Sequence, residues 1–268
     1  MTDEQVARYA PFLESYVKIR SREGWERNAA YYLRLPGVDK DDPQAEVWRI
    51  RRRSLRVLER ILQRRFSSTQ ENWALDLGAG NCWLSRRLAK LGFRTVALDL
   101  NTVGRDSLAR GQLYIEYDDL QIHRIQASMD QPPLTDNAFA LCTVSGAIYY
   151  ANLEATLASV YRILQPGGIL AITDSPIYSK STYGLQMAQE QRARITSLVG
   201  QEPAPLPGGD GFLVWPNLKS TMEQIGFGVQ AISVARPLGR IRRLISRVLA
   251  PGRREEASFP VILGQKPQ

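Results

Sequence analysis

The strongest constraint on the fold is the regular alternation of short apolar runs with helical segments between residues 73 and 173. The run at 73–77 ends in a glycine turn, and the helical segment that follows it, 82–91, is closed by Gly92. The same order recurs along the chain as far as residue 173. Strands that alternate with helices of this length are typical of a parallel, doubly wound sheet.

Seven strands and six main helices are predicted from this pattern. The strands cover 73–77, 95–98, 122–127, 139–144, 169–173, 228–234 and 259–264, and the helices 48–66, 82–91, 106–113, 153–164, 181–198 and 217–225. The last two strands need no crossover helix between them, so they are expected to pair antiparallel at one edge. The predicted fold class is therefore α/β, with a doubly wound, mostly parallel seven-stranded sheet and an antiparallel edge strand.

Four further regions complete the predicted organisation. Residues 1–66 are expected to form an N-terminal helical cap and the first core helix, and 67–268 the core. Within that core, 176–212 combines a polar helix with a loop rich in proline and glycine, and it follows a strand. Because insertions after a strand overhang the ligand crevice of such sheets, we expect this insertion to be a lid. A second insertion, 236–256, is basic and amphipathic.

Residues 74–84 read ALDLGAGNCWL, a strand that enters a glycine-rich turn at a helix N-terminus. Such a turn offers a ligand bare backbone amides and the positive end of a helix dipole, although many α/β proteins have one for packing alone. A dinucleotide-binding fingerprint needs a third glycine, which lets the helix approach the strand. Trp83 occupies that third position. The sequence therefore argues against a nicotinamide or flavin dinucleotide.

Two carboxylates accompany this turn. Asp76 lies two residues before the first glycine, and Asp99 ends the next strand. A carboxylate in the second position can accept both hydroxyls of an adenosine ribose, and each charge-assisted hydrogen bond contributes roughly 1.5 to 3 kcal/mol. The alternative interpretation of Asp99 is an exposed residue at a strand end. In combination with the glycine turn, Asp99 favours an adenosine ligand.

Four stretches make the sequence resemble the class I S-adenosylmethionine-dependent methyltransferases, in their small-molecule, methyltransferase type 11-like branch. They are 75–80 (LDLGAG), 96–99 (VALD), 133–141 and 162–168 (RILQPGG). The last stretch is the more specific, because helix, proline, double glycine and strand recur together in that branch. The resemblance covers roughly residues 48–268, and it implies a Rossmann-like methyltransferase fold with S-adenosylmethionine as the cofactor.

The resemblance also implies where that cofactor lies. In the family, the glycine loop passes under the methionine part, and the acid that ends the second strand holds the ribose. The loop after the third strand lines the adenine, and the residues after the fourth strand border the transferred methyl group. The cofactor-binding residues implied for this chain are Asp76, Gly78, Ala79, Gly80, Asp99, Leu100, Ser128, Met129 and Ser145.

Three positions depart from the pattern of the family. Cys82 stands where a third glycine is usual, Ser128 stands where an aspartate often reaches the adenine amino group, and Ala140 replaces the aspartate that usually follows Phe139. A serine hydroxyl can still donate or accept a hydrogen bond, and the neighbouring Asp130 is a candidate to replace the missing acid.

No catalytic residue is assigned from the sequence. A sulfonium already carries a good leaving group, so methyl transfer needs chiefly in-line alignment, which can supply roughly 7 to 11 kcal/mol in favourable cases. Candidates for a substrate clamp or general base follow the predicted strands, with packing or cofactor lining as their alternative roles: Tyr149, Tyr150, Asp174 and Tyr178. His123 is expected to be structural. No cluster has the spacing of metal ligands, so no metal is expected.

Basic residues concentrate in the flanks of the chain. The net charge is +8, and residues 236–256 hold seven arginines against two glutamates. Within this insertion, 238–250 has apolar residues on one helical face and arginines on the other. Such a helix can contact an anionic membrane surface or a nucleic acid, or it can pack on the sheet edge with its arginines in water. We expect membrane contact more than nucleic acid, and the oligomeric state is not assigned.

The remaining features predict a cytoplasmic enzyme. The first five residues are acidic where a secretory signal would be basic, and no apolar run reaches about 18 residues. Cys82 and Cys142 lack a CxxC spacing and are expected to stay reduced. The function expected from the resemblance is methyl transfer to a small or lipid-like molecule. The alternatives are an RNA methyltransferase and a non-catalytic protein that binds S-adenosylmethionine.

Overall fold

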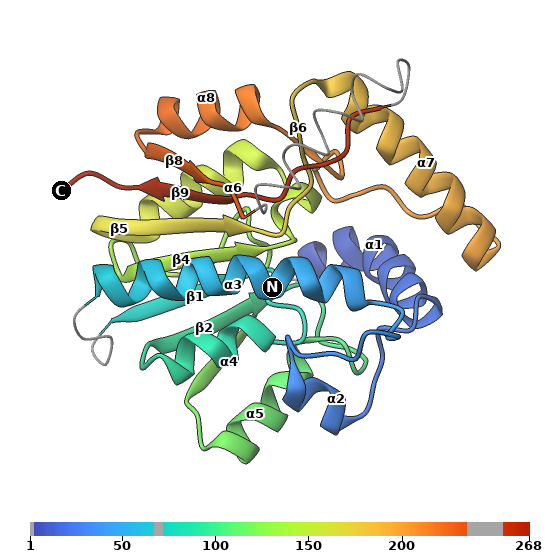
Figure 1. Cartoon of the computed structure of the whole chain (residues 1–268), viewed down its shortest axis with the longest axis horizontal. Helices are drawn as coiled ribbons and strands as arrows, with labels where there is room; N and C mark the ends of the chain where they lie inside the picture. Colours follow the sequence, from blue (N-terminus) through green and yellow to red (C-terminus); the bar gives the residue numbers. More distant parts are fainter. Residues whose placement is uncertain (1–2, 67–71, 235–253) are drawn as a thin grey trace.

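The computed structural model describes residues 3–66, 72–234 and 254–268, and its centre is a seven-stranded sheet (Figure 1). The strand order is β3-β2-β1-β4-β5-β9-β8. The first five strands run parallel, whereas β9 pairs antiparallel with both β5 and β8. Their bounds are β1 Trp73–Leu77, β2 Arg94–Asp99, β3 Ile122–Gln126, β4 Phe139–Ser145, β5 Leu164–Thr173, β8 Gly228–Ile232 and β9 Val261–Gln265. The predicted α/β class and the antiparallel pairing at one edge are confirmed.

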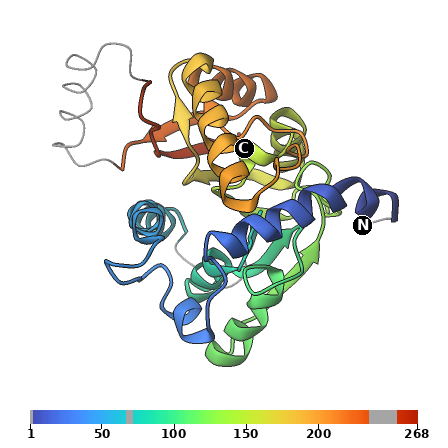
Figure 2. The ribbon, with the colours of Figure 1, turned by 90° about the vertical axis from the view of Figure 1, so that its right-hand side faces the viewer.

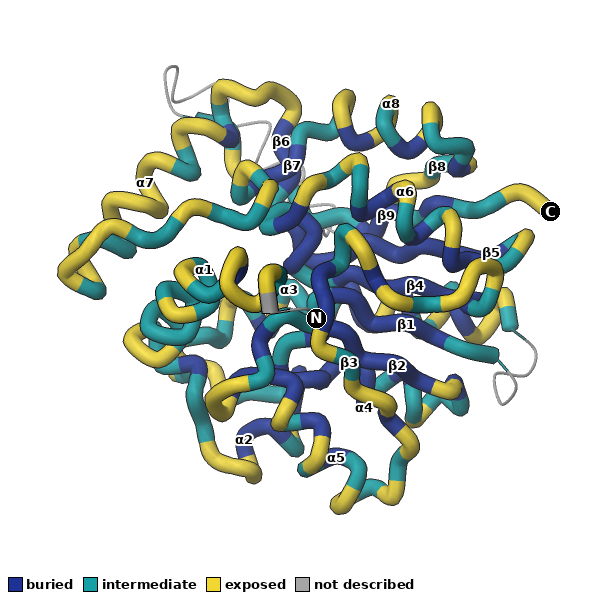
Figure 3. The backbone as a smooth tube through the Cα atoms, turned by 180° about the vertical axis from the view of Figure 1, so that it is seen from behind, coloured by how far each residue is buried: buried dark blue, intermediate teal, exposed yellow. Residues whose placement is uncertain are grey.

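Helices cover both faces of this sheet, because successive strand residues point to opposite sides. Ala74 and Ala97 face a cluster that includes Leu58 of α3, whereas Leu75 and Leu77 face the other cluster. The first cluster is covered by α3 (Ala45–Arg65), α4 (Trp83–Lys90) and α5 (Gly111–Asp118), and the second by α6 (Leu153–Ile163) and α8 (Trp215–Ile225). The strands β1, β2, β4 and β5 are mostly buried, whereas the outer strands β3 and β8 have exposed residues (Figure 3). Both cysteines are buried and free.

Two predicted boundaries were wrong. The helix expected at 106–113 is a 3₁₀ turn, η1 (Leu108–Arg110), followed by α5, because the side chain of Asp106 is engaged by Arg20 and Asn81 instead. The strand expected at 169–173 begins at Leu164, so it includes the proline and the double glycine. A register shift between Phe139 and Leu141 accommodates these residues.

The N-terminal cap is longer than the sequence indicated. Its first helix, α1 (Asp3–Arg22), has 20 residues and lies beside α7 (Ser181–Val199), and the short α2 (Ala29–Arg34) follows it (Figures 1 and 2). The insertion predicted at 176–212 contains α7, and β6 (Ile177–Tyr178) in it pairs with β7 (Leu213–Val214). The domain boundaries given above remain a prediction.

The basic helix predicted at 238–250 lies outside the described residues, as does all of the insertion 236–256 before residue 254. Among the helices of the described chain, none is both long enough and apolar enough to cross a membrane.

We expect Leu58→Ala to lower the free energy of unfolding by about 2 to 5 kcal/mol, because Leu58 is 1% exposed and its loss leaves a cavity between α3 and the sheet. Urea unfolding of the full chain measures this change. Arg56→Ala, at an exposed position of the same helix, is the control and should change the stability little. Equal stabilities of the two variants would contradict the packing of α3 described here.

Candidate functional site

A pocket opens at the carboxyl ends of the parallel strands. Sheets of this topology bind ligands at that edge, where the strand order reverses between β1 and β4. The residues that line the pocket come from α1, from α3 and from the turns after β1, β2, β3 and β4. They include all nine residues that the resemblance implies for the cofactor: Asp76, Gly78, Ala79, Gly80, Asp99, Leu100, Ser128, Met129 and Ser145.

The turn between β1 and α4 depends on left-handed backbone at alternate residues. Gly78 has φ +66° and Gly80 has φ +51°, which glycine adopts without steric cost. A Cβ atom on Gly78 would come within 2.4 Å of Ala147. Around Gly80 no atom lies within 4 Å of such a Cβ, so its side facing the pocket is open. The turn therefore presents bare backbone to a ligand.

Cys82, the third left-handed residue of this turn, does not line the pocket. Its φ of +61° explains why the related family usually has glycine there. The side chain is fully buried, and its Sγ lies 3.9 Å from the carbonyl oxygen of Leu108. A Cβ on Gly111 would come within 3.2 Å of the same sulfur atom. Cys82 therefore packs between α4 and α5 and leaves the ligand side of the turn unchanged.

The carboxylate of Asp99 joins the ends of β1 and β2. Its Oδ2 accepts a hydrogen bond from the backbone N–H of Gly80 at 2.8 Å, and its Oδ1 accepts one from Asn101 N–H at 2.7 Å. Burial raises the pKa of this carboxyl group, and the two backbone donors act against that shift. Each oxygen keeps a lone pair for a further donor, such as a ligand hydroxyl.

Asp76 is the most deeply buried acid of the site, at 1% exposure. Ser85 Oγ donates to its Oδ2 at 2.6 Å and Thr143 Oγ1 donates to its Oδ1 at 3.1 Å, so the carboxyl group ties β1 to α4 and β4. Desolvation raises the pKa of Asp76 to about 6, against the effect of the two hydroxyl groups.

On the side of β3, Ser128 forms the wall of the pocket together with Met129 and Asp130. The Tyr9 hydroxyl of α1 donates to Ser128 Oγ at 3.2 Å, which attaches the helix to this wall. Asp130 accepts a hydrogen bond from Thr156 Oγ1 at 2.7 Å, and burial raises its pKa. Asp130 therefore lines the pocket close to Ser128, with one oxygen already engaged, and its role in place of the missing acid stays a prediction.

Two of the four predicted substrate residues line the pocket. These are Tyr149 and Tyr150, whose ring centroids are 4.6 Å apart. Burial, followed by the neighbouring Tyr150, raises the pKa of Tyr149 well above its ordinary value, so its phenol is a hydrogen-bond donor rather than a base near neutral pH. Tyr178 lies away from the pocket, with its ring 6.1 Å from that of Phe212. Asp174 does not line the pocket itself, but its carboxylate accepts a hydrogen bond from Ser145, which does.

The loop before β7 is fastened to the two tyrosines through backbone atoms. Gly209 N–H donates to the carbonyl of Tyr150 at 3.1 Å, and Gly211 N–H donates to that of Tyr149 at 3.0 Å. A Cβ on Gly209 would lie 2.1 Å from the Tyr149 carbonyl oxygen, so glycine is required there. Pro207 of the same loop lines the pocket.

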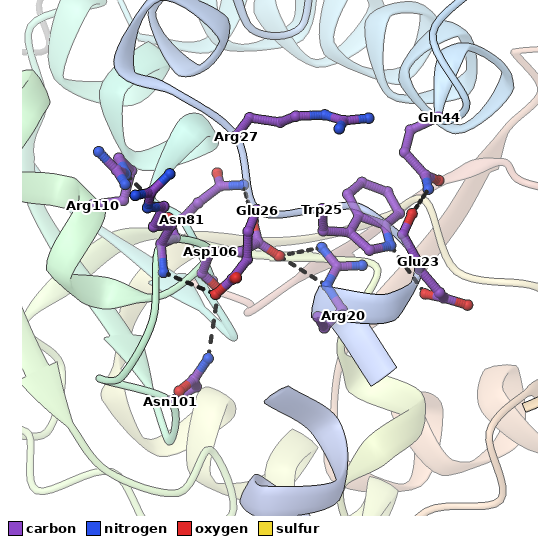
Figure 4. A network of polar contacts seen from close by, with 12 residues as sticks. Arg20, Glu23, Trp25, Glu26, Arg27, Gln44, Asn81, Asn101, Asp106 and Arg110 are labelled. Atoms are coloured by element: carbon purple, nitrogen blue, oxygen red, sulfur yellow. Dashed lines mark hydrogen bonds and ion pairs between the residues drawn. The ribbon is translucent and has the colours of Figure 1, made fainter. Parts of the chain in front are cut away.

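Helix α1 covers the pocket, which the sequence interpretation did not identify. Its lining residues, Phe12, Leu13, Tyr16 and Arg20, have helical spacing, and that periodicity was the signal that could have located them. Arg20 anchors the helix end through Asp106, with Nε and Nη2 at 2.8 and 2.5 Å from Oδ2, while Asn81 donates to Oδ1 at 2.7 Å (Figure 4).

Arg51 of α3 also lines the pocket and was not predicted. Its guanidinium lies over the rings of Trp48 and Trp25, at 4.6 and 5.5 Å from their centroids. Within the described part of the chain, no group of three or more histidine, cysteine or carboxylate side chains is arranged to hold a metal ion.

Part of this chain is similar to known methyltransferases. Residues 75–172 match the family model described as a methyltransferase domain. The malonyl-[acyl-carrier protein] O-methyltransferase of Serratia marcescens is 33% identical over 97 residues, 36% of this chain and 35% of that protein. The dimethylglycine N-methyltransferase of Parasynechococcus marenigrum is 36% identical over 107 residues, 39% and 38% of the two chains. The matches thus span little more than a third of these relatives.

Solved structures share the fold over a larger part of the chain. The YcgJ protein from Bacillus subtilis aligns with a TM-score of 0.60 at 13% identity, over 80% of this chain and 98% of its own. Geranyl diphosphate C-methyltransferase from Streptomyces coelicolor, solved with Mg²⁺, geranyl diphosphate and S-adenosyl-L-homocysteine, aligns with a TM-score of 0.54 at 13% identity, over 88% and 87% of the two chains.

We expect Asp76→Asn to remove part of the pH dependence of stability. The pKa of Asp76 is raised in the folded chain, so the wild type binds more protons folded than unfolded, and its stability falls as the pH rises from about 4 to 6. A rise of the Asp76 pKa from 3.8 to about 6 lowers the free energy of unfolding of the wild type by about 3 kcal/mol above pH 6. The free energy of unfolding of the variant, relative to wild type, should rise by up to that amount over this range.

Chemical unfolding at pH values between 3.5 and 7.5 measures this difference. Asp119→Asn, at an exposed carboxyl group, is the control and should follow the wild type at every pH. Parallel stability curves for wild type and Asp76→Asn would contradict the assignment.

Proposed function

We propose that this chain, which carries a class I methyltransferase domain, transfers the methyl group of S-adenosylmethionine to a small or lipid-like acceptor molecule. The observation that carries the proposal is the half-buried Asp99 beside the open glycine turn. Its oxygens face a pocket at the carboxyl ends of the strands, where an adenosine ribose would supply two hydroxyl donors.

The residues of the pocket fit this cofactor from end to end. Gly78 and Gly80 leave backbone exposed where a side chain would fill the space. Asp99 supplies acceptors for the ribose, and Ser128 with Asp130 supplies polar groups for the adenine edge. Trp83 excludes the third glycine of a dinucleotide site, and it is buried against Trp48 with ring centroids 5.5 Å apart. These features support a nucleoside cofactor rather than a dinucleotide.

The chain's own residues would act by binding and orientation. S-adenosylmethionine supplies a methyl group on a positively charged sulfur atom that already has a good leaving group. The acceptor would lie beside Tyr149 and Tyr150, beneath Phe12 and Tyr16 of α1, so that it is shielded from water on several sides. Such alignment can contribute roughly 7 to 11 kcal/mol in favourable cases, without a fixed general base.

The enclosure of the pocket favours a small or lipid-like acceptor over RNA. Aromatic side chains from α1 and from the segment after β4 narrow the acceptor side: the rings of Phe12 and Tyr16 lie 6.0 and 6.1 Å from that of Tyr150. The RNA alternative rested on the basic insertion, almost all of which lies outside the described residues. No described residue favours a non-catalytic role over methyl transfer. Contact of 238–250 with an anionic membrane surface remains a proposal that supports a lipid-like acceptor.

We expect Asp99→Asn to weaken the binding of S-adenosylhomocysteine, the demethylated product, about 10- to 100-fold, because charge-assisted hydrogen bonds to the ribose are lost. Calorimetry on the full chain measures this affinity, and a nicotinamide dinucleotide should give no binding. Asp119→Asn is the matched control. Unchanged affinity in Asp99→Asn would remove this residue from the site.

Transfer itself is tested by incubating the chain with S-adenosylmethionine labelled in its methyl group and a fractionated cell extract. We expect label to appear in a low-molecular-weight or lipid fraction. Label confined to RNA would favour the alternative acceptor. Cofactor binding without labelling of any fraction would favour the non-catalytic protein.

A further inference from the structure

Two charged side chains beside the acceptor end of the pocket each have a buried polar atom without a hydrogen-bond partner among the described residues. These atoms are Nε of Arg51 and Oδ1 of Asp174. Buried polar atoms in folded proteins are nearly always paired, so an unpaired one indicates a missing partner. Here one atom of a cationic group and one atom of an anionic group lack a partner in the same region.

The two groups meet at Gly146, the residue that follows β4. A Cβ built on Gly146 would lie 3.7 Å from Nη2 of Arg51 and 3.8 Å from Cβ of Asp174. Gly146 lines the pocket, and so does Arg51. Because this residue has φ +64°, glycine suits the position, and a Cβ there would come within 3.3 Å of the carbonyl oxygen of Asp174.

Arg51 presents the edge of its guanidinium that suits a carboxylate. Arginine binds a carboxylate with two parallel N–H groups, and Nε together with Nη2 form one such edge. Among the described residues Nε has no hydrogen-bond partner, and Nη2 lies 3.7 Å from the position of a Cβ on Gly146. The guanidinium lies over the rings of Trp48 and Trp25, which orient it. The edge formed by Nε and Nη2 is therefore available to a carboxylate.

Asp174 presents the complementary group. Its Oδ2 accepts hydrogen bonds from Ser145 Oγ at 2.8 Å and Thr173 Oγ1 at 3.0 Å, which orient the carboxylate and leave Oδ1 without a donor. The residue is 9% exposed.

We propose that Arg51 and Asp174 together form a subsite for an α-amino carboxylate group, with its carboxylate on Arg51 and its ammonium on Asp174. The subsite rests on the proposed function, because that function supplies two ligands of this chemistry. One is the methionine end of the cofactor, and the other is a methyl acceptor of the amino-acid type.

The binding of two nucleosides shows which of these two ligands the subsite holds. S-adenosylhomocysteine carries the α-amino carboxylate, whereas 5′-methylthioadenosine has the same nucleoside and a thioether without it. If the subsite holds the cofactor, Arg51→Met and Asp174→Asn should each lower the affinity for S-adenosylhomocysteine about 10- to 100-fold. The affinity for 5′-methylthioadenosine should change less than about twofold. Arg51→Lys keeps the charge and should recover part of the loss.

If the subsite holds the acceptor, both nucleosides bind the variants as they bind the wild type. The protein is then saturated with S-adenosylhomocysteine and tested with glycine, sarcosine and dimethylglycine. At least one of these amino acids should raise the thermal midpoint of the wild type but not that of Arg51→Met or Asp174→Asn. The controls are Arg56→Met, exposed on the same helix, and Asp119→Asn, exposed with φ +53° and so matched to Asp174 in backbone conformation.

Several outcomes overturn the subsite. One is unchanged binding of both nucleosides in the variants with no response to the three amino acids. Another is equal weakening of both nucleosides, which would mean that the residues act through the fold. A lower thermal midpoint without any change in affinity would make Arg51 and Asp174 a structural pair. Failure of both nucleosides to bind the wild type would instead overturn the proposed function, and the subsite with it.

Discussion

The geometry of the site depends on the turn that follows β1. Three alternate residues there, Gly78, Gly80 and Cys82, have φ between +51° and +66°. The turn is held to β2 by the carbonyl of Leu98, which accepts the N–H groups of Gly78 and Ala79, and by the carboxylate of Asp99. One set of hydrogen bonds therefore fixes the backbone that faces the ligand and the acid beside it.

The local part of this arrangement could be predicted from the sequence. Glycines after an apolar run, and an aspartate ending the next run, reflect backbone geometry and chain direction, both of which are encoded within a few residues. The role of Cys82 could not be predicted in this way. Its left-handed backbone is visible only in three dimensions, where the side chain fills a space beside Gly111 and stays out of the pocket.

The residues that reach the pocket from segments distant in the sequence could not be predicted either. Arg51 belongs to a helix rich in arginine, and nothing local distinguishes it from exposed Arg56. Only the packing of α3 on the sheet brings Arg51 to the pocket. The covering residues Phe12, Tyr16, Arg51 and Pro207 all lie outside the 75–172 region that matches the methyltransferase family model. The matched region supplies the floor of the pocket, and segments outside that region supply its cover.

The attachment of that cover has a consequence for local stability. In the described chain, neither hydrophobic cluster includes a side chain from α1. The helix is held instead by single polar contacts, such as Tyr9 to Ser128 and Arg20 to Asp106, and by rings that meet Tyr150. Lifting it exposes little core, so it costs less free energy than global unfolding. Amide hydrogens of α1 should accordingly exchange with solvent when this helix alone opens, at rates that do not depend on the unfolding of the sheet.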